Sequence, residues 1–383
     1  MNPVDVVVVG GGVVGTSAAY HLAAAGAGSV LLLEREDSLG TGSTGRCAGG
    51  FRHQFSSEIN VRLSIKSIRM IVSFQETHGL PLDVDRDGYL FLVRDQAEWR
   101  EFLAGVELQR SLGVDTRVLS PEEAAEISPG ISTEGVIGAT FCPEDGIADP
   151  SGLTLGYATA ARRAGAVIET GVEVTAVDVR GGRAVGVATR GGPVAAGAVV
   201  NAAGPWGDEL ARTAGVAMPL EPIPRHVLVT APFEEAPHKR TLVIDATSTF
   251  YFHREGGGVL MGMGAAGERP SFDLTPDDRF IAEELLPAAV RVFPALEHAG
   301  IAHRWMGLYE MTPDRHPIIG EVPGVRGFFL ANGFSGHGFQ HAPVVGKLLS
   351  EMIVDGKATT VDVSSLGLDR FEKHRLVREA RVV

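Results

Sequence analysis

Residues 4 to 34 carry the pattern that most constrains the fold of this chain. Val4–Val9 is an almost continuous run of apolar residues, which is typical of a strand buried on both faces of a parallel sheet. A motif of the form G-x-G-x-x-G follows directly, at Gly10, Gly12 and Gly15. The alanine-rich segment 13–25 predicts a helix, and the apolar run 29–33 predicts a second strand that ends at Glu34. Together they predict a βαβ unit that binds an adenine dinucleotide.

The residues of this unit have separate physical roles. Gly10 allows a tight turn from strand to helix, Gly12 lets a pyrophosphate approach the backbone, and Gly15 lets the helix pack closely on the strand. The N-terminus of the helix, which begins near Val13, favours the negative charge of the phosphates. Glu34 stands about 20 residues after the glycines, where a carboxylate accepts hydrogen bonds from ribose hydroxyls and repels a 2′-phosphate. The unit therefore disfavours NADP.

A second segment, 262–267, matches the same glycine pattern but lacks its context. Pro270 follows closely and stops any helix, and no second strand ending in an acid comes at the right distance. We interpret this segment as a strand end and turn. The chain is therefore expected to have one dinucleotide site, and not the pair of a flavin reductase that uses NAD(P)H.

The composition is that of an ordinary globular protein and excludes several partners. The 383 residues suit two domains, and 44% of them are hydrophobic. The net charge of −13 argues against nucleic acid or an anionic membrane as a partner. No apolar run reaches the roughly 18 residues that span a bilayer. Cys47 and Cys142 are the only cysteines, so we expect no disulfide framework and a cytoplasmic location.

The order of the predicted elements indicates an α/β chain with a discontinuous nucleotide-binding domain. Alternating strands and helices are predicted within residues 1–83, 144–215 and 313–383. Two stretches richer in strands, 84–143 and 216–312, interrupt that domain. They predict a second, substrate-binding domain built on a mainly antiparallel sheet.

Several helices are predicted outside the first unit: over 96–112 and 153–164, after a capping box at Ser120 and Glu123, and in three further segments. A long amphipathic helix is predicted over 57–78, because apolar residues recur there at helical spacing. Thr275, Pro276 and Asp278 predict the start of another helix. The last helix is predicted over 338–354, after a glycine-rich turn.

Four separated blocks of sequence resemble the D-amino-acid-oxidase superfamily of FAD-dependent amine oxidoreductases. Within it, the chain is most similar to the sarcosine oxidase, glycine oxidase and L-proline dehydrogenase β-subunit group. The blocks are 10–15 with Glu34 and Arg35, 42–52, 199–206, and 312–314 with 333–339. The resemblance covers almost the whole chain and implies a Rossmann-like FAD-binding domain of the glutathione-reductase type with an inserted α+β substrate domain.

The resemblance implies that residues of all four blocks contact FAD. The expected cofactor-binding residues are Gly10, Gly12, Val13, Val14, Gly15, Glu34, Arg35, Gly42, Ser43, Thr44, Arg46, Cys47, Val174, Ala203, Gly204, Trp206, Gly307, Gly333, Ser335, Gly336, His337, Gly338, Phe339 and Gln340. The positive N-terminus of the last helix could stabilise negative charge on the flavin. We interpret Cys47, which lies in this set, as a small packing residue and not a redox thiol.

The resemblance also bears on how the flavin is held and on metals. Gly307 and Arg46 stand where relatives carry a cysteine or a histidine that attaches flavin covalently, so we expect non-covalent FAD. His337 and His341 have the spacing of a metal pair, but no glutamate lies between them and no third ligand is evident. We expect no metal site.

Four residues are candidates for the chemistry. Arg52 aligns with a carboxylate-binding arginine of sarcosine oxidases, and an arginine holds a carboxylate with two parallel hydrogen bonds. Tyr251 and Tyr309 align with active-site tyrosines of the same group, and His253 could orient the substrate amine. The alternatives left open are an interdomain salt bridge for Arg52, core packing for the tyrosines and an exposed strand edge for His253.

The resemblance implies an enzyme that oxidises the C–N bond of a small secondary or cyclic amino acid, sarcosine-like or proline-like, to an imine by hydride transfer to FAD. Two alternatives stay open: a flavin-carrying β subunit of a multi-subunit amino-acid dehydrogenase, and a glycine or D-amino-acid oxidase. Tyr309 replaces an arginine of glycine oxidases, and Gln340 replaces a lysine of sarcosine oxidases. An apolar residue near Leu260 replaces their oxygen-activating lysine, so oxygen or another electron acceptor remains open, as does a homo-oligomer or a partner subunit.

We predict that the purified protein carries FAD without a covalent bond. The reason is that Gly307 and Arg46 offer no nucleophile that relatives use for attachment. Acid precipitation should therefore release all of the yellow colour into the supernatant. Colour retained in the pellet would contradict the prediction, and bound NAD in place of flavin would contradict the wider interpretation.

Overall fold

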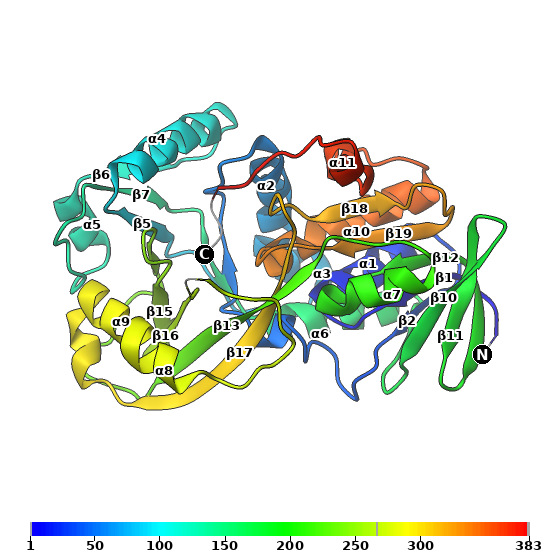
Figure 1. Cartoon of the computed structure of the whole chain (residues 1–383), viewed down its shortest axis with the longest axis horizontal. Helices are drawn as coiled ribbons and strands as arrows, with labels where there is room; N and C mark the ends of the chain where they lie inside the picture. The colour runs from blue at the N-terminus through cyan, green and yellow to red at the C-terminus, as the bar shows by residue number, and fades with distance from the viewer. Residues whose placement is uncertain (1, 266, 381–383) are drawn as a thin grey trace.

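The chain folds into two halves, each built around its own large sheet. The structure is a computed structural model that describes residues 2–265 and 267–380. Within these residues there are two eight-stranded sheets and a small three-stranded sheet. Figure 1 shows the N-terminal strand and helix in the right-hand half, and strands β13 and β17 extending between the halves.

The predicted βαβ unit is present. It consists of β1 (Val4–Val9), α1 (Val13–Ala24) and β2 (Val30–Leu33). Gly10 has a φ of +110°, which a residue with a side chain rarely adopts, and a Cβ at Gly15 would lie 1.8 Å from the carbonyl oxygen of Gly10. Both glycines therefore do what the sequence predicted of them: the first turns the chain, and the second brings helix and strand together.

The first sheet is parallel at its centre and antiparallel at one side. β1 pairs in parallel with β2 and with β12 (Gly192–Asn201), and β2 pairs with β9 (Val167–Glu169). β12 also pairs in parallel with β19 (Phe328–Asn332). The antiparallel additions are β10 (Val174–Arg180) and β11 (Arg183–Thr189) at the start of β12, and β18 (Ile318–Glu321) beside β19.

Helices far apart in the sequence pack against α1. They are α6 (Pro150–Arg163) and α10 (Gly338–Val354), and α10 in turn contacts α2 (Glu58–Val72). The apolar residues of β1 and β2 on this side form one core with α1 and α10. The first sheet also packs against α7 (Gly207–Thr213) and α11 (Asp369–Glu372) through a second apolar cluster.

The second sheet is antiparallel except at one pair. Its order is β17 (Ile301–Met311), β13 (Glu221–Thr230), β16 (Gly258–Met263), β15 (Tyr251–Glu255), β14 (Leu242–Asp245), β5 (Tyr89–Val93), β7 (Gly138–Cys142) and β6 (Arg117–Leu119). The parallel pair is β14 with β5. Helices in this half are α4 (Gln96–Ser111), α5 (Pro121–Ile127), α8 (Asp278–Phe280) and α9 (Leu286–Val292). The fold is therefore the predicted α/β fold with a mainly antiparallel second sheet.

The described structure differs from the sequence predictions in several local details. The helix predicted over 57–78 is interrupted at Ser73, which separates α2 from α3 (Phe74–His78). The helix predicted to open at Thr275 begins instead at Asp278, because the side chain of Asp277 accepts hydrogen bonds from the backbone of residues 279 and 280. The Gly/Ser-rich segment 38–50, for which the sequence predicted no helix or strand, contains a short 3₁₀ turn at Thr44–Arg46 and the start of β3.

A small sheet contributes residues to apolar clusters that include residues of both halves of the chain. It pairs β3 (Gly50–Phe51), β8 (Gly146–Ala148) and β4 (Val84–Asp85).

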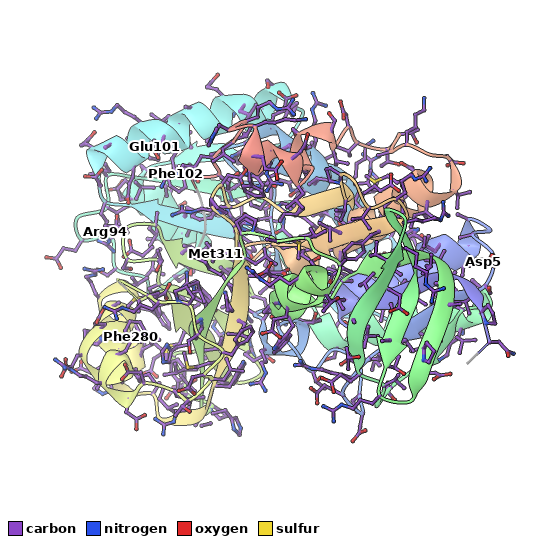
Figure 2. The ribbon with its side chains drawn as sticks, turned by 45° about the vertical axis from the view of Figure 1, so that its right-hand side comes forward. Asp5, Arg94, Glu101, Phe102, Phe280 and Met311 are labelled. Carbon is purple, nitrogen blue, oxygen red and sulfur yellow. The ribbon has the colours of Figure 1, made fainter. Side chains whose placement is uncertain are left out.

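The two large sheets lie at opposite ends of the molecule, as the positions of Asp5 and Phe280 in Figure 2 show. Asp5 lies in β1 of the first sheet and accepts hydrogen bonds from Ser29, whereas Phe280 belongs to the apolar core of the second sheet. Within the described residues, no helix is long and apolar enough to cross a membrane.

We predict that Gly346→Ala destabilises the protein and weakens cofactor binding, although residue 346 does not line the cavity described below. A Cβ at Gly346 would lie 2.6 Å from the backbone carbonyl carbon of Ser17 in α1, so α10 and α1 must separate. Overpacking of this kind costs about 1–3 kcal/mol, which exceeds the helix propensity that alanine gains. Thermal unfolding and FAD content of the variant measure the effect.

Gly300→Ala is the matched control for this substitution. No atom lies within 4 Å of a Cβ at Gly300, so its unfolding midpoint should stay close to that of the parent. Equal midpoints for the two variants would show that the helices do not depend on this close contact.

Candidate active site

A cavity of about 640 Å³ extends from the glycine motif to the face of the second sheet. Its lining combines residues of both halves of the chain. Glu34 and Arg35 line one end, while Arg52 and Tyr309 line it on the side of the antiparallel sheet. An elongated site of this kind fits a dinucleotide with its adenosine at the glycine motif and its other end at the second sheet.

The end near the glycine motif has the features that a pyrophosphate and a ribose require. Gly12 caps α1 without a side-chain hydrogen bond, and both Gly12 and Val13 line the cavity. Thr44 reaches the same point, because its Oγ1 accepts a hydrogen bond from the backbone N–H of Val13 at 3.2 Å. The Glu34 carboxylate accepts from the N–H of Gly11 at 2.5 Å. The start of α1 thus places the Thr44 hydroxyl and the Glu34 carboxylate beside the helix N-terminus, whose positive end favours a phosphate.

The loop 42–47 is fixed to β17 at the middle of the cavity. The hydroxyl of Ser43 donates to the carbonyl oxygen of Leu308 at 2.7 Å, and Arg46 Nη1 donates to that of Met306 at 3.1 Å. Gly307 lies directly beside this loop, since a Cβ there would lie 3.2 Å from the Cβ of Arg46. The two positions that the resemblance associates with covalent attachment of flavin are therefore neighbours in the fold.

The N-terminus of α10 also faces the cavity. His337 caps the helix, and residues 336–340 line the cavity. Gly336 has a φ of +91°, and a Cβ there would lie 2.4 Å from the ring of Tyr309. Gln340 accepts from the backbone N–H of Arg52 at 2.9 Å and donates to its carbonyl oxygen at 3.2 Å. The first turn of the helix therefore sets the position of Arg52.

Arg52 is buried, with only 4% of its surface exposed. Its guanidinium lies 4.2 Å from the ring centre of Phe55, and Nη1 donates to the carbonyl oxygen of Gln54 at 2.5 Å. Nη2 lies 3.2 Å from Nε2 of His337. Burial lowers the pKa of His337 well below its usual value, so the imidazole is neutral and Nε2 can accept from Arg52. The arginine is held in place at the cavity wall.

Three tyrosines on strands of the second sheet line the cavity. They are Tyr89, Tyr251 and Tyr309. Burial raises the pKa of each phenol, so each stays neutral and can donate a hydrogen bond. Gly262 is paired with Tyr251, and a Cβ there would lie 2.4 Å from its hydroxyl. The second glycine motif thus begins at the end of β16, as the sequence predicted, and Gly262 leaves room for the side chain of Tyr251.

Glu310 and Arg225 line the cavity and were not identified from the sequence. Burial raises the pKa of Glu310 to about 7. One carboxylate oxygen accepts from the N–H of Phe334 at 3.3 Å, and the other has no hydrogen-bond partner among the described residues. Arg225 forms an ion pair with Glu268. Both strands also contain other charged or polar residues, so neither Glu310 nor Arg225 stood out in the sequence.

Several predicted residues lie behind the cavity wall. Gly15, Gly333, Ser335 and His253 are absent from its described lining. His253 is 1% exposed, and its Nδ1 lies 2.7 Å from the carbonyl oxygen of Arg254, so it is not at an exposed strand edge. Ser335 contacts the backbone N–H of Thr312 at 3.2 Å and supports the loop that precedes α10. The other predicted cofactor residues line the cavity, as do Arg52, Tyr251 and Tyr309.

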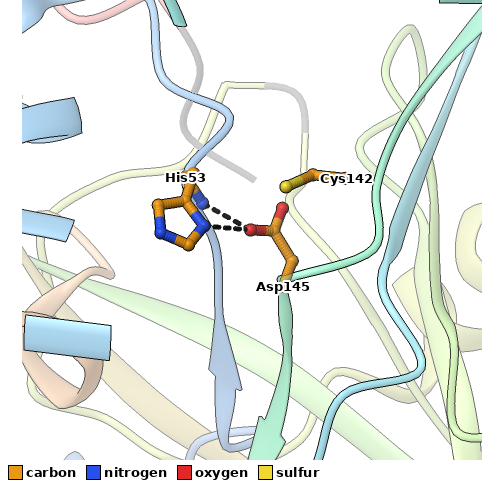
Figure 3. Close-up of side chains that lie close together, drawn as sticks. All are labelled: His53, Cys142 and Asp145. Carbon is orange, nitrogen blue, oxygen red and sulfur yellow. Dashed lines mark hydrogen bonds and ion pairs between the residues drawn. The ribbon is translucent and has the colours of Figure 1, made fainter. Parts of the chain in front are cut away.

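A cluster of possible metal ligands occurs elsewhere, at His53, Cys142 and Asp145 (Figure 3). Asp145 Oδ1 is 2.7 Å from both the backbone nitrogen and Nδ1 of His53. Burial raises the pKa of the Cys142 thiol, which disfavours the thiolate that binds metals. The cluster is explained by internal hydrogen bonds. His337 and His341 are both buried and contact Arg52 and Ser64, respectively.

Comparisons with known proteins agree with this geometry. Residues 5–352 match the family model described as FAD dependent oxidoreductase. The chain is 32% identical to mouse mitochondrial sarcosine dehydrogenase over 98% of its own length but only 42% of that protein, so it spans less than half of this relative. It is 32% identical to the FAD-dependent oxidoreductase domain-containing protein 1 of Bos taurus, over 96% of this chain and 84% of the relative.

Solved structures show the same fold. L-proline dehydrogenase from P. horikoshii superposes with a TM-score of 0.91 at 35% identity, over 98% of this chain and 100% of that one. Glycine oxidase from Geobacillus kaustophilus superposes with a TM-score of 0.85 at 26% identity, over 97% and 99% of the two chains.

We predict that ionisation of Glu310 destabilises the folded protein. The pKa of Glu310 is about 7 in the folded protein, against 4.5 for an ordinary glutamate carboxyl. The contribution of Glu310 to the free energy of unfolding is therefore fully present below pH 4.5 and is lost as the pH rises through 7. Glu310→Gln keeps the shape without titrating. The free energy of unfolding of the parent relative to this variant should fall by roughly 3 kcal/mol between pH 4.5 and pH 8.

Glu107→Gln on the exposed side of α4 serves as the control and should reproduce the pH profile of the parent. If Glu310→Gln also reproduces that profile, Glu310 does not titrate as its burial implies.

Proposed function

Because the chain belongs to the FAD-dependent oxidoreductase family, we propose that it oxidises the C–N bond of a small secondary or cyclic amino acid, with FAD held non-covalently in the cavity. The observation that carries this proposal is the position of Arg52. A buried guanidinium lies at the inner wall of the cavity, where it can hold a substrate carboxylate, beside three neutral phenols. The likeness to L-proline dehydrogenase over the whole of both chains supports a proline-like or sarcosine-like substrate.

The residues that would hold FAD come from three parts of the chain. We assign residues 1–83, 144–215 and 313–383 to the FAD-binding domain and residues 84–143 and 216–312 to the substrate domain. The start of α1 would bind the pyrophosphate, Glu34 the ribose, and the N-terminus of α10 the flavin end. Bound FAD would supply the acceptor for a hydride equivalent taken from the carbon next to the amine.

The remaining steps depend on residues of this chain. Arg52 would orient the substrate through its carboxylate, and Gln340 holds the backbone of Arg52 from both sides. The phenols of Tyr251 and Tyr309 can donate hydrogen bonds but carry no charge, so they limit water and orient polar groups without repelling the amine. The amine must react in its neutral form, whose lone pair forms the imine that water then hydrolyses.

Two alternatives have their own support. A flavin-carrying subunit of a multi-subunit dehydrogenase is consistent with the chain spanning less than half of sarcosine dehydrogenase. A glycine oxidase is consistent with the superposition on that enzyme, although Tyr309 provides no cation. Leu260 is buried among apolar residues, so an electron acceptor other than oxygen is compatible with either alternative.

The function is tested by mixing the purified holoprotein with amino acids in the absence of oxygen. We expect sarcosine or L-proline to bleach the flavin absorbance of the lone chain. Bleaching by glycine or a D-amino acid alone would favour an oxidase of that class, and no bleaching by any amino acid would contradict the proposal. Reoxidation in air against a dye acceptor then separates an oxidase from a dehydrogenase.

For the substrate that bleaches the flavin, we predict that Arg52→Ala raises KM by at least 30-fold while FAD stays bound. Loss of one charged partner of a carboxylate costs roughly 2–5 kcal/mol. Arg52→Lys should recover only part of the loss, because lysine lacks the planar fork. Unchanged kinetics in the alanine variant would place Arg52 outside the substrate site, and loss of FAD would assign it to cofactor binding.

A further inference from the structure

The cavity contains a second buried arginine that the proposed function does not use. Arg225 lies on β13, and only 14% of its side chain is exposed. Its guanidinium carbon lies 5.0 Å from the ring centre of Tyr309. In the sheet register Arg225 pairs with Gly307, which also lines the cavity. The arginine is therefore part of the cavity wall near the expected substrate.

Arg52 and Arg225 approach Tyr309 from different elements of the fold. Arg52 follows β3 and is held by α10, whereas Arg225 belongs to the antiparallel sheet. The charges of both guanidiniums act on the Tyr309 phenol and oppose the rise of its pKa on burial. The two guanidiniums therefore lie on the same part of the cavity wall, around Tyr309.

The hydrogen-bonding capacity of Arg225 is incompletely used. Glu268 forms an ion pair with it at Nη1. Nε is buried and has no hydrogen-bond acceptor among the described residues. A guanidinium has five N–H donors in a fixed fork, so a second carboxylate can bind an edge that Glu268 leaves free.

Acidic side chains are few among the described lining residues at the substrate end, and Glu268, which balances the charge of Arg225, is not one of them. Among the cavity's described lining residues, Glu34, Glu36, Glu173 and Glu209 belong to the segments around the dinucleotide end. At the substrate end the acidic lining residue is Glu310, which burial keeps partly protonated at neutral pH. A substrate with a single carboxylate would leave one of the two arginines without a substrate partner.

We propose that the substrate carries two carboxylates, one bound by Arg52 and the other by Arg225. The chemical class is a secondary amine with two acidic groups, such as an N-carboxyalkyl amino acid. This inference rests on the proposed amine oxidation and adds the specificity of its site. Arg225 is a specificity-determining residue, and Glu268 competes with the second carboxylate for it.

The test uses two pairs of compounds that differ by one carboxylate. Iminodiacetate and sarcosine are compared as substrates by kcat/KM. Thiodiacetate and (methylthio)acetate, which have sulfur in place of the amine, are compared as ligands by their perturbation of flavin absorbance. The second pair needs no turnover, so it reports on Arg225 even if neither amine is oxidised. We expect the diacid to bind at least 10-fold more tightly than the monoacid.

Three variants then separate ligand binding from a structural ion pair. Arg225→Met should lower the preference for the diacid at least 10-fold, so that the diacid and the monoacid bind about equally, because a charged partner of a carboxylate is lost. Glu268→Gln should increase that preference, since it removes the competing anion. Arg304→Met is the control: it lies on the adjacent strand β17, is half exposed and lines no part of the described cavity, so the preference should not change.

The proposal requires the preference for the diacid to fall in Arg225→Met and to rise in Glu268→Gln. Equal binding of the diacid and the monoacid by the parent protein would overturn the proposal, as would equal losses for both ligands in Arg225→Met. If the preference for the diacid falls in both Arg225→Met and Glu268→Gln, the ion pair between Arg225 and Glu268 has only a structural role, and the proposal is wrong. Bleaching by sarcosine in any of these cases would leave the proposed amine oxidation intact. If Arg225→Met does not fold, Arg225→Lys is used in its place. The logarithm of its preference for the diacid over the monoacid should be about half that of the parent protein.

Discussion

The backbone of β17 holds the cavity together, because its carbonyl groups bind segments from distant parts of the chain. Met306 and Leu308 accept hydrogen bonds from the loop 42–47, and Glu310 accepts from the N–H of Ser335 at 3.1 Å. The same strand places Gly307 and Tyr309 at the cavity. A loop that follows the nucleotide-binding unit, a strand of the second sheet and the start of α10 are thereby fixed relative to one another.

Burial sets the charge of the groups that this arrangement brings together. Desolvation keeps the tyrosines protonated and His337 neutral, and it moves the pKa of Glu310 to about 7. Arginine alone keeps its charge at such a site, because its ordinary pKa is so high. The substrate end thus combines two arginines, one of them paired with Glu268, with neutral hydrogen-bond donors, which suits an acidic ligand whose amine must be uncharged to react.

The features that were predicted well are those encoded within a short stretch of chain. The strand, glycine turn and helix around Gly10 depend on local periodicity and on backbone conformations that only glycine adopts freely. The capping box predicted at Ser120 is present for the same reason. Short strands outside the glycine motif were missed: β14 has four residues and β3 has two, and neither has a neighbouring motif like that which marked β2. Such strands exist because a neighbouring strand supplies their hydrogen bonds.

The sequence by itself determined the fold class, the nucleotide-binding unit and most of the residues around the predicted cofactor, because these depend on local patterns and on a family resemblance. Only the tertiary structure decided which charged residues meet at the substrate end. Arg52 and Arg225 are separated by more than 170 positions and reach one cavity only because α10 and β17 bring their segments together. Spacing in the sequence does not contain this information, since burial and electrostatic coupling depend on distance in space.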